Sequence, residues 1–146
     1  MRLLLATGCR RNEIGKLQWG EIGDERITIS ATRMKGGGKH EVPLLPLIAK
    51  LLPTRPKGAS PQTFLFGRLR VKTGYNGWSF AKPILDKRMA ALGVVDRWTL
   101  HDLRRTLSTR LNDAGVPPHV VEALLAHEVP GVAGVYNPCG ISAAES

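Results

Sequence analysis

The chain has 146 residues, of which 42% are hydrophobic and 23% are charged, proportions typical of one ordinary soluble domain. Its 21 Lys and Arg residues against 12 Asp and Glu residues give a net charge of +9. This excess favours a polyanionic partner, with nucleic acid ahead of an anionic membrane. No apolar run approaches the roughly 18 residues of a membrane-spanning helix. Leu3–Leu5 is too short for a signal-peptide core, so we expect a cytoplasmic protein.

The cysteines and histidines predict no metal site. Cys9 and Cys139 form no CxxC pair, and two free thiols are expected, although a disulfide stays open. The His residues lack zinc-type spacing, and no two carboxylates stand in a metal-nuclease cluster. We therefore expect neither a metal nor another cofactor.

Hydrophobic periodicity and turn residues predict a mostly helical α+β domain with one small antiparallel sheet. The helices are expected at residues 2–6, 11–17, 47–52, 76–92 and 100–114, and in a segment opened by Pro117-Pro118. The sheet is expected from residues 26–30 and 40–45, with 64–66 as a candidate addition. Pro83 is expected to interrupt or kink the helix at 76–92.

Three of these helices have a predicted apolar side, and Ile14, Leu17 and Trp19 are expected to face inward. The helix at 76–92 has the apolar side Ile84, Leu85, Met89 and Leu92, and the helix at 100–114 has Leu100, Leu103, Leu107 and Leu111. In the segment opened by Pro117-Pro118, one side is expected to be buried, through Val120, Val121, Leu124 and Leu125.

The start of the helix at 100–114 has the clearest chemical signal. Thr99 is a plausible N-cap with Asp102 as its capping-box partner. His101 and Arg104 are three apart and hence neighbours on the helix surface, near an N-terminus that favours anions. The pair indicates phosphate binding, and a solvated cationic helix is the plainer alternative.

Other candidate residues have equally plain alternatives. Lys35 precedes the Gly36–Gly38 turn at the mouth of the hairpin, where a surface lysine is common. Arg10 lies near Glu13, so a surface ion pair also explains it. His127 fits a helix C-cap, and Tyr136 fits a buried aromatic.

In order, however, six residues resemble the catalytic set of the tyrosine recombinase (phage integrase) family, which runs Arg, Lys, His-x-x-Arg, His or Trp, Tyr. The surrounding motifs are Ala-Thr-Gly-Cys-Arg ending at Arg10, Met34-Lys35, and Leu-Leu-Ala-His ending at His127. The matching residues are Arg10, Lys35, His101, Arg104, His127 and Tyr136.

The resemblance implies site-specific DNA cleavage and rejoining through a 3′-phosphotyrosyl intermediate. It implies that Tyr136 is the nucleophile and that Lys35 is the general acid. Arg10 and Arg104 would bind the non-bridging oxygens of the scissile phosphate. His101 would accept or relay the tyrosine proton, and His127 would hydrogen-bond the phosphate.

The resemblance also implies double-stranded DNA as partner, together with other protomers in a synaptic complex, as a tetramer on DNA. Residues 1–146 are expected to form the catalytic domain, without the family's N-terminal core-binding domain and the start of the first catalytic helix. A bacterial or phage-encoded protein associated with the nucleoid is expected. A catalytically idle DNA-binding remnant of a prophage integrase and a type IB topoisomerase-like strand transferase stay open.

Overall fold

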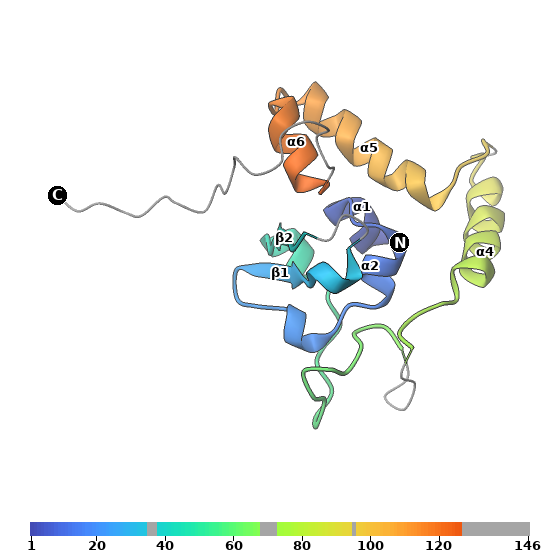
Figure 1. The fold of residues 1–146 in the computed structure, drawn as a ribbon. Coiled ribbons are helices and arrows are strands. Elements are labelled where there is room, and N and C mark those ends of the chain that lie inside the picture. Colours follow the sequence, from blue (N-terminus) through green and yellow to red (C-terminus); the bar gives the residue numbers. More distant parts are fainter. Residues whose placement is uncertain (35–37, 68–72, 95, 127–146) are drawn as a thin grey trace.

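The computed structural model describes residues 1–34, 38–67, 73–94 and 96–126. Within these residues the fold is mostly helical with a two-stranded antiparallel sheet, which confirms the predicted class. The elements are α1 (Arg2–Thr7), α2 (Arg11–Gly15), β1 (Arg26–Ile29), β2 (His40–Pro43), α3 (Pro46–Ala49), α4 (Trp78–Ala91), α5 (Leu100–Asp113) and α6 (Pro118–Leu124). In Figure 1, α1, α2 and the sheet lie together, α5 and α6 lie above them, and α4 stands to one side.

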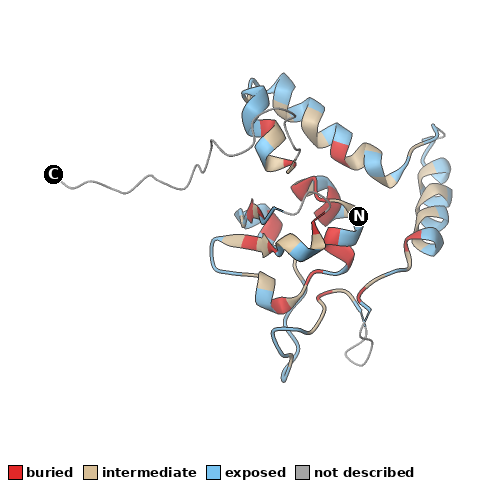
Figure 2. Ribbon diagram, viewed as in Figure 1, coloured by how far each residue is buried: buried red, intermediate tan, exposed pale blue. Residues whose placement is uncertain are grey.

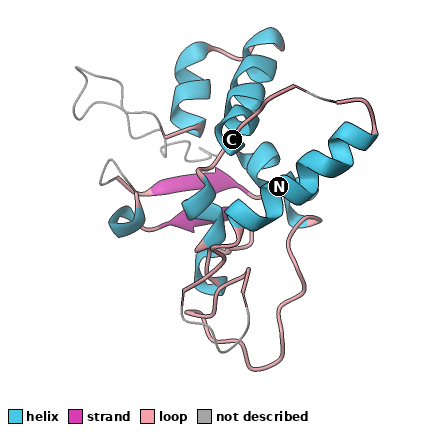
Figure 3. Ribbon diagram, turned by 90° about the vertical axis from the view of Figure 1, so that its right-hand side faces the viewer, coloured by secondary structure: helices cyan, strands magenta, loops and turns pink. Residues whose placement is uncertain are grey.

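The sheet is the predicted hairpin. Arg26 of β1 is opposite Pro43 of β2, and Ile29 is opposite His40. Alternate residues point into the core, so Ile27 and Ile29 are almost fully buried while their neighbours are partly exposed. Seen from the side in Figure 3, α5 and α6 lie on one side of this hairpin and the loops that follow α3 lie on the other.

The segment 64–66 does not extend this sheet, so that expectation is wrong. Phe64 forms an isolated antiparallel bridge with Gln18, and the Leu65 N–H donates to the carbonyl oxygen of Leu17 at 2.8 Å. The segment therefore satisfies backbone groups of the chain that follows α2. Leu17 itself is fully buried, as predicted.

Helix α5 begins as predicted. The Asp102 carboxylate accepts hydrogen bonds from the backbone N–H of Thr99 at 2.7 Å and from its hydroxyl at 2.8 Å. Leu100 and Leu103 pack against the core, as the apolar pattern indicated. The helix ends just before Gly115, whose φ of 79° is the left-handed conformation that glycine adopts readily.

Helix α4 differs from its prediction. It continues through Pro83 as one helix, and Trp78 is its buried residue. On the predicted apolar side, Ile84 is 43% exposed and Leu92 is 83% exposed, so none of the described elements covers this side at either residue. Figure 2 shows the same pattern, with red at the start of α4 and exposed positions along it. Periodicity identifies an apolar side, but it does not reveal whether another element covers that side.

Helix α6 begins at the predicted proline pair and packs against α5. Val121 and Leu125 are each 1% exposed, as predicted, whereas Val120 is 38% exposed and the prediction for it is wrong. The buried residues hold the end of α6 close to α1 and α5. The Leu125 carbonyl oxygen at this end accepts a hydrogen bond from Arg104, a residue of the site described next.

Candidate active site

A cleft of about 650 Å³ lies between the loop before α2, one side of α4 and the start of α5. Six basic residues, from four parts of the chain, contribute to its lining: Arg10, Arg11, Arg33, Lys82, His101 and Arg104. The other wall carries Trp78, Lys82 and Trp98. The cleft therefore combines several cations with aromatic surface, which suits an anionic ligand that also has planar groups.

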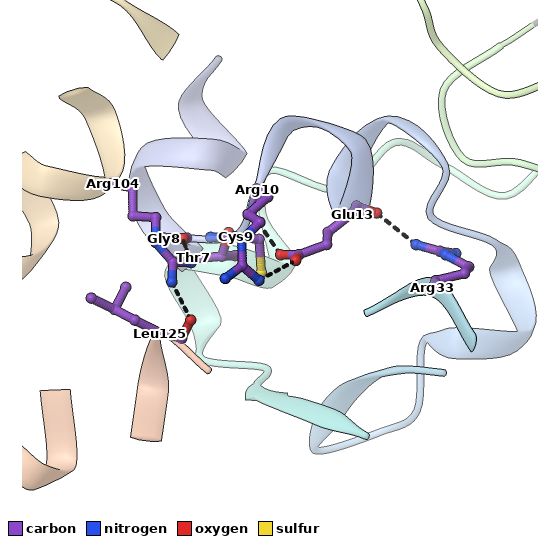
Figure 4. A network of polar contacts seen from close by, with 8 residues as sticks. All are labelled: Thr7, Gly8, Cys9, Arg10, Glu13, Arg33, Arg104 and Leu125. Carbon is purple, nitrogen blue, oxygen red and sulfur yellow. Dashed lines mark hydrogen bonds and ion pairs between the residues drawn. The ribbon is translucent and has the colours of Figure 1, made fainter. Parts of the chain in front are cut away.

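Arg104 is the buried cation of this group, with 4% of its surface exposed. Its Nη1 donates to the carbonyl oxygen of Gly8 at 2.7 Å, and its Nη2 donates to the carbonyl oxygen of Leu125 (Figure 4). Burial, followed by the positive charge of Arg10, lowers the pKa of Arg104. A guanidinium nevertheless stays charged at neutral pH, so the site holds a fixed positive charge.

Arg10 is the N-cap residue of α2 and is held by Glu13, three residues further on. The Arg10 N–H donates to Glu13 Oε2 at 2.6 Å, and Arg10 Nη1 lies 3.0 Å from Glu13 Oε1. The Glu13 side chain is 4% exposed, while that of Arg10 is 35% exposed. The ion pair that the sequence offered as the plainer alternative is thus present, and it orients Arg10 at the cleft.

His101 lies in the first turn of α5 and is exposed. The Thr99–Asp102 capping contacts fix the start of this helix, so they also fix where His101 projects. His101, Arg10 and Arg104 are therefore three predicted site residues that the fold brings to one cleft. Arg10 lies more than ninety residues before His101 and Arg104 in the sequence, and the Arg104–Gly8 contact joins these two regions.

Lys82 and Trp98 are cleft residues that the sequence did not single out for the site. The Lys82 ammonium lies 4.3 Å from the centre of the Trp98 ring and 2.7 Å from Asp86 Oδ2. The contact joins α4 to the chain just before α5. The spacing of Lys82 and Asp86, four apart on a helix, is the signal that predicts their pairing.

Two buried groups close to the arginines titrate abnormally. Burial raises the pKa of the Cys9 thiol to about 12, which makes it a poor nucleophile at neutral pH. Burial lowers the pKa of His40, and its Nε2 has no hydrogen-bond partner among the described residues. Neither group therefore adds charge next to the arginines at neutral pH.

Three predicted site residues, Lys35, His127 and Tyr136, lie outside the described residues. The described segment before Lys35 ends at Met34, which is buried, and the last described segment ends at Ala126, just before His127. Ala126 has a φ of 48°, a left-handed conformation that is uncommon for alanine. The roles of the three residues stay predictions.

No group of three or more potential metal ligands is found among the residues that the structure describes. Across the same residues, no helix has the length and apolar character needed to span a membrane.

Residues 1–138 match the Phage integrase family. The chain is 30% identical to the prophage integrase IntZ of Escherichia coli (strain K12), over 94% of this chain and 34% of that protein. It is 30% identical to the integrase of Shigella phage Sf6, over 93% of this chain and 35% of that protein. It is 28% identical to the tyrosine recombinase XerC of Mesorhizobium japonicum (strain LMG 29417 / CECT 9101 / MAFF 303099), over 94% of this chain and 45% of that protein.

The fold is also similar to a solved structure, the Tn1549 transposon integrase in complex with circular intermediate DNA. That similarity has a TM-score of 0.61 at 20% identity and covers 88% of this chain and 48% of the other. The chain spans about a third of the length of the prophage and phage relatives named above.

Proposed function

Because the chain belongs to the Phage integrase family, we propose that it cleaves and rejoins DNA strands at specific sites through a covalent tyrosine–DNA intermediate. Residues 1–146 then act as the catalytic domain of such a recombinase. The proposal extends to this chain the activity that the names of its relatives describe.

The observation that carries the proposal is the convergence of Arg10, Arg104 and His101 on one cleft. Both arginines are held by protein groups, Arg10 by the Glu13 carboxylate and Arg104 by two backbone carbonyls. Preorganised cations stabilise negative charge that develops in a transition state, and this is usually the largest catalytic contribution. Two fixed guanidinium groups suit the non-bridging oxygens of a phosphodiester undergoing substitution.

The proposed cleavage step is a substitution at phosphorus. The Tyr136 oxygen bonds to phosphorus while the bond from phosphorus to the 5′-oxygen breaks, leaving a 3′-phosphotyrosyl ester and a free 5′-hydroxyl. His101 accepts or relays the tyrosine proton, Lys35 donates a proton to the departing 5′-oxygen, and His127 hydrogen-bonds the phosphate. Ionising a tyrosine with pKa near 10 at neutral pH costs about 4 kcal/mol, which the surrounding cations offset. Rejoining reverses these proton transfers.

The net charge of +9 supports binding to double-stranded DNA. Lys87 and Arg88 are exposed on α4, beyond the cleft, and would add contacts to the phosphate backbone. We propose further that recombination takes place in a synaptic complex, with four protomers on two DNA sites.

A suicide substrate tests the activity. The full chain is incubated with a pool of duplexes that have randomised sequence and a nick, so that the short 5′ product diffuses away after cleavage. The protein is expected to retain DNA through denaturing electrophoresis, and Tyr136→Phe to retain none. An adduct on the Phe variant would contradict the assignment of the nucleophile.

The same samples separate the alternatives. DNA binding without any adduct would favour an idle DNA-binding remnant. Relaxation of a supercoiled plasmid at protein concentrations too low for synapsis would favour a topoisomerase-like activity.

A further inference from the structure

Arg33 is a cleft-lining arginine that the predicted catalytic set does not include. It ends the 3-10 turn Ala31–Arg33, and its side chain is only 20% exposed. Its Nη2 donates to the carbonyl oxygen of Glu13 at 2.8 Å, and its Nη1 donates to that of Lys16 at 2.5 Å. Nη1 also lies 2.5 Å from Glu21 Oε2. Three acceptors of the protein therefore bind the guanidinium, and one of them is a carboxylate.

The Glu21 carboxylate is itself fixed. Its side chain is 12% exposed, and the oxygen that pairs with Arg33 also accepts the backbone N–H of Gln18 at 2.9 Å. A planar fork of donors matches three separate acceptors, whereas a lysine ammonium on a flexible stem matches them poorly. A phosphate contact would require Arg33 to leave these acceptors, so its contacts favour a role within the protein.

Helix α2 depends on donors from outside itself. It has five residues, and a helix this short is marginal without tertiary contacts. The last carbonyl groups of a helix have no partner within it. Arg33 supplies donors at Glu13 and Lys16, and the Tyr75 N–H donates to the carbonyl oxygen of Gly15 at 2.7 Å. Arg33 thereby fixes the backbone of α2 at Glu13.

Glu13 connects Arg33 to Arg10, as Figure 4 shows. Its side chain is 4% exposed. One carboxylate oxygen accepts the Arg10 backbone N–H at 2.6 Å, and the other accepts a hydrogen bond from Arg10 Nη1 at 3.0 Å. A shift of the Glu13 backbone would move this carboxylate, and the carboxylate would move both the backbone and the guanidinium of Arg10.

We propose that Arg33 is a positioning residue, which holds Arg10, through Glu13, in the orientation that binds the non-bridging oxygens of the scissile phosphate. This inference rests on the proposed function for the phosphate contact of Arg10. Arg33 itself makes no bond to the reacting atoms in this role.

Side-chain NMR of protein labelled with ¹⁵N-arginine tests this orientation directly, in the full chain without DNA. A guanidinium held by fixed acceptors rotates slowly and gives separate Nη–H signals, which Arg10→Lys and Arg104→Lys assign. In Arg33→Ala the Arg10 signals are expected to merge. Those of Arg104 should stay separate, because the carbonyl oxygens of Gly8 and Leu125 hold it independently. Arg33→Lys should behave in the same way, since it keeps the charge and loses the fork.

Three NMR results would overturn the inference. They are merged Arg10 signals in the unmodified protein, separate Arg10 signals in the Arg33 variants, and loss of the Arg104 signals together with those of Arg10, which would indicate general loosening. Thermal melts show which variants are folded at the measuring temperature. Arg33→Lys decides the question if Arg33→Ala is not folded.

Cleavage measures the consequence for the reaction. With a saturating suicide duplex of the selected sequence, Arg33→Ala and Arg33→Lys are expected to form the adduct about 10²-fold more slowly, the loss typical of a small misplacement of a catalytic group. Their DNA affinity and its salt dependence should stay close to those of the unmodified protein. A direct phosphate contact would instead weaken binding and reduce the salt slope by about 1. That result, or an unchanged cleavage rate, would overturn the positioning role.

Arg26→Ala is the matched control. Arg26 lies in the same hairpin and pairs with Glu41 across the strands, its Nη1 3.0 Å from Glu41 Oε2. Its replacement should change neither the Arg10 signals nor the rate of cleavage.

The two measurements separate the inference from the proposed function. If the unmodified protein forms no adduct, the proposed function fails, and the phosphate contact of Arg10 fails with it. If the unmodified protein forms the adduct but the Arg10 signals stay separate in the Arg33 variants, the role of Arg33 is overturned and the proposed function stands.

Discussion

Gly8 lies where α1 ends and where α5 and α6 approach it. Its φ is 66°, in the left-handed region. A Cβ atom at this position would lie 2.5 Å from Leu125 Cδ2 and 2.9 Å from Leu107 Cδ2, well inside van der Waals contact. The Gly8 carbonyl oxygen also accepts the hydrogen bond from Arg104. Gly8→Ala therefore perturbs both the packing of α5 and α6 and the placement of a site residue.

The expected loss follows from two contributions. Placing a non-glycine residue in the left-handed region costs roughly 1–2 kcal/mol. Inserting a methyl group into a packed region costs about 1–3 kcal/mol, and we expect the lower part of this range because leucine side chains can shift at their ends. Leu125 is 1% exposed and has little room to move, so the inserted methyl group still lowers the free energy of unfolding. The free energy of unfolding should fall by about 2–4 kcal/mol, a large part of the 5–15 kcal/mol typical of a domain.

Gly115→Ala provides the control. Gly115 has a φ of 79°, and a Cβ atom added there would have no heavy atom within 4 Å, so its replacement adds backbone strain alone. Urea denaturation of both variants, with equal m values, gives the difference in stability directly. Gly8→Ala should lose at least about 1 kcal/mol more than Gly115→Ala, which is the steric contribution. Equal losses would refute the argument that close approach at Gly8 constrains the site.

Three further predictions follow from the buried groups around the arginines. Arg104→Lys should lower stability by about 2 kcal/mol in urea denaturation, because one ammonium cannot reach both carbonyl oxygens and a buried acceptor loses a charged donor; an unchanged midpoint would contradict this. Burial lowers the pKa of His40 below its usual 6.5, so the unfolded chain binds more protons there; stability should be complete above that pH and fall as the pH drops toward the folded-state pKa, and His40→Phe should flatten the fall. In a Cys139→Ser background, Cys9 should react with iodoacetamide after denaturation and resist it when folded, since its pKa is raised to about 12 and its side chain is buried; equal rates would exclude that environment.

Local signals predicted local structure well. The Thr99–Asp102 capping contacts and the β1–β2 hairpin each depend on residues close in sequence or on strict alternation, and both are present. The differences concern exposure: Val120, which is predicted to be buried, is 38% exposed, and Ile84, on the predicted apolar side of α4, is 43% exposed. A helix pattern specifies which residues share a face, whereas burial depends on the element that packs against it.

The candidate site depends on contacts that no local pattern contains. Arg104 donates to carbonyl groups 96 residues and 21 residues away, and Arg33 donates to one 20 residues away. Backbone carbonyls carry no residue-specific signal, so motif matching identifies the arginines but not the partners that orient them. Closing loops of such different lengths costs entropy before any contact forms, and the burial of α1, α5 and α6 against one another must compensate for it. The geometry around the arginines is therefore a property of the assembled core, and a substitution that loosens the packing at Gly8 is expected to disturb the site without removing any of its predicted residues.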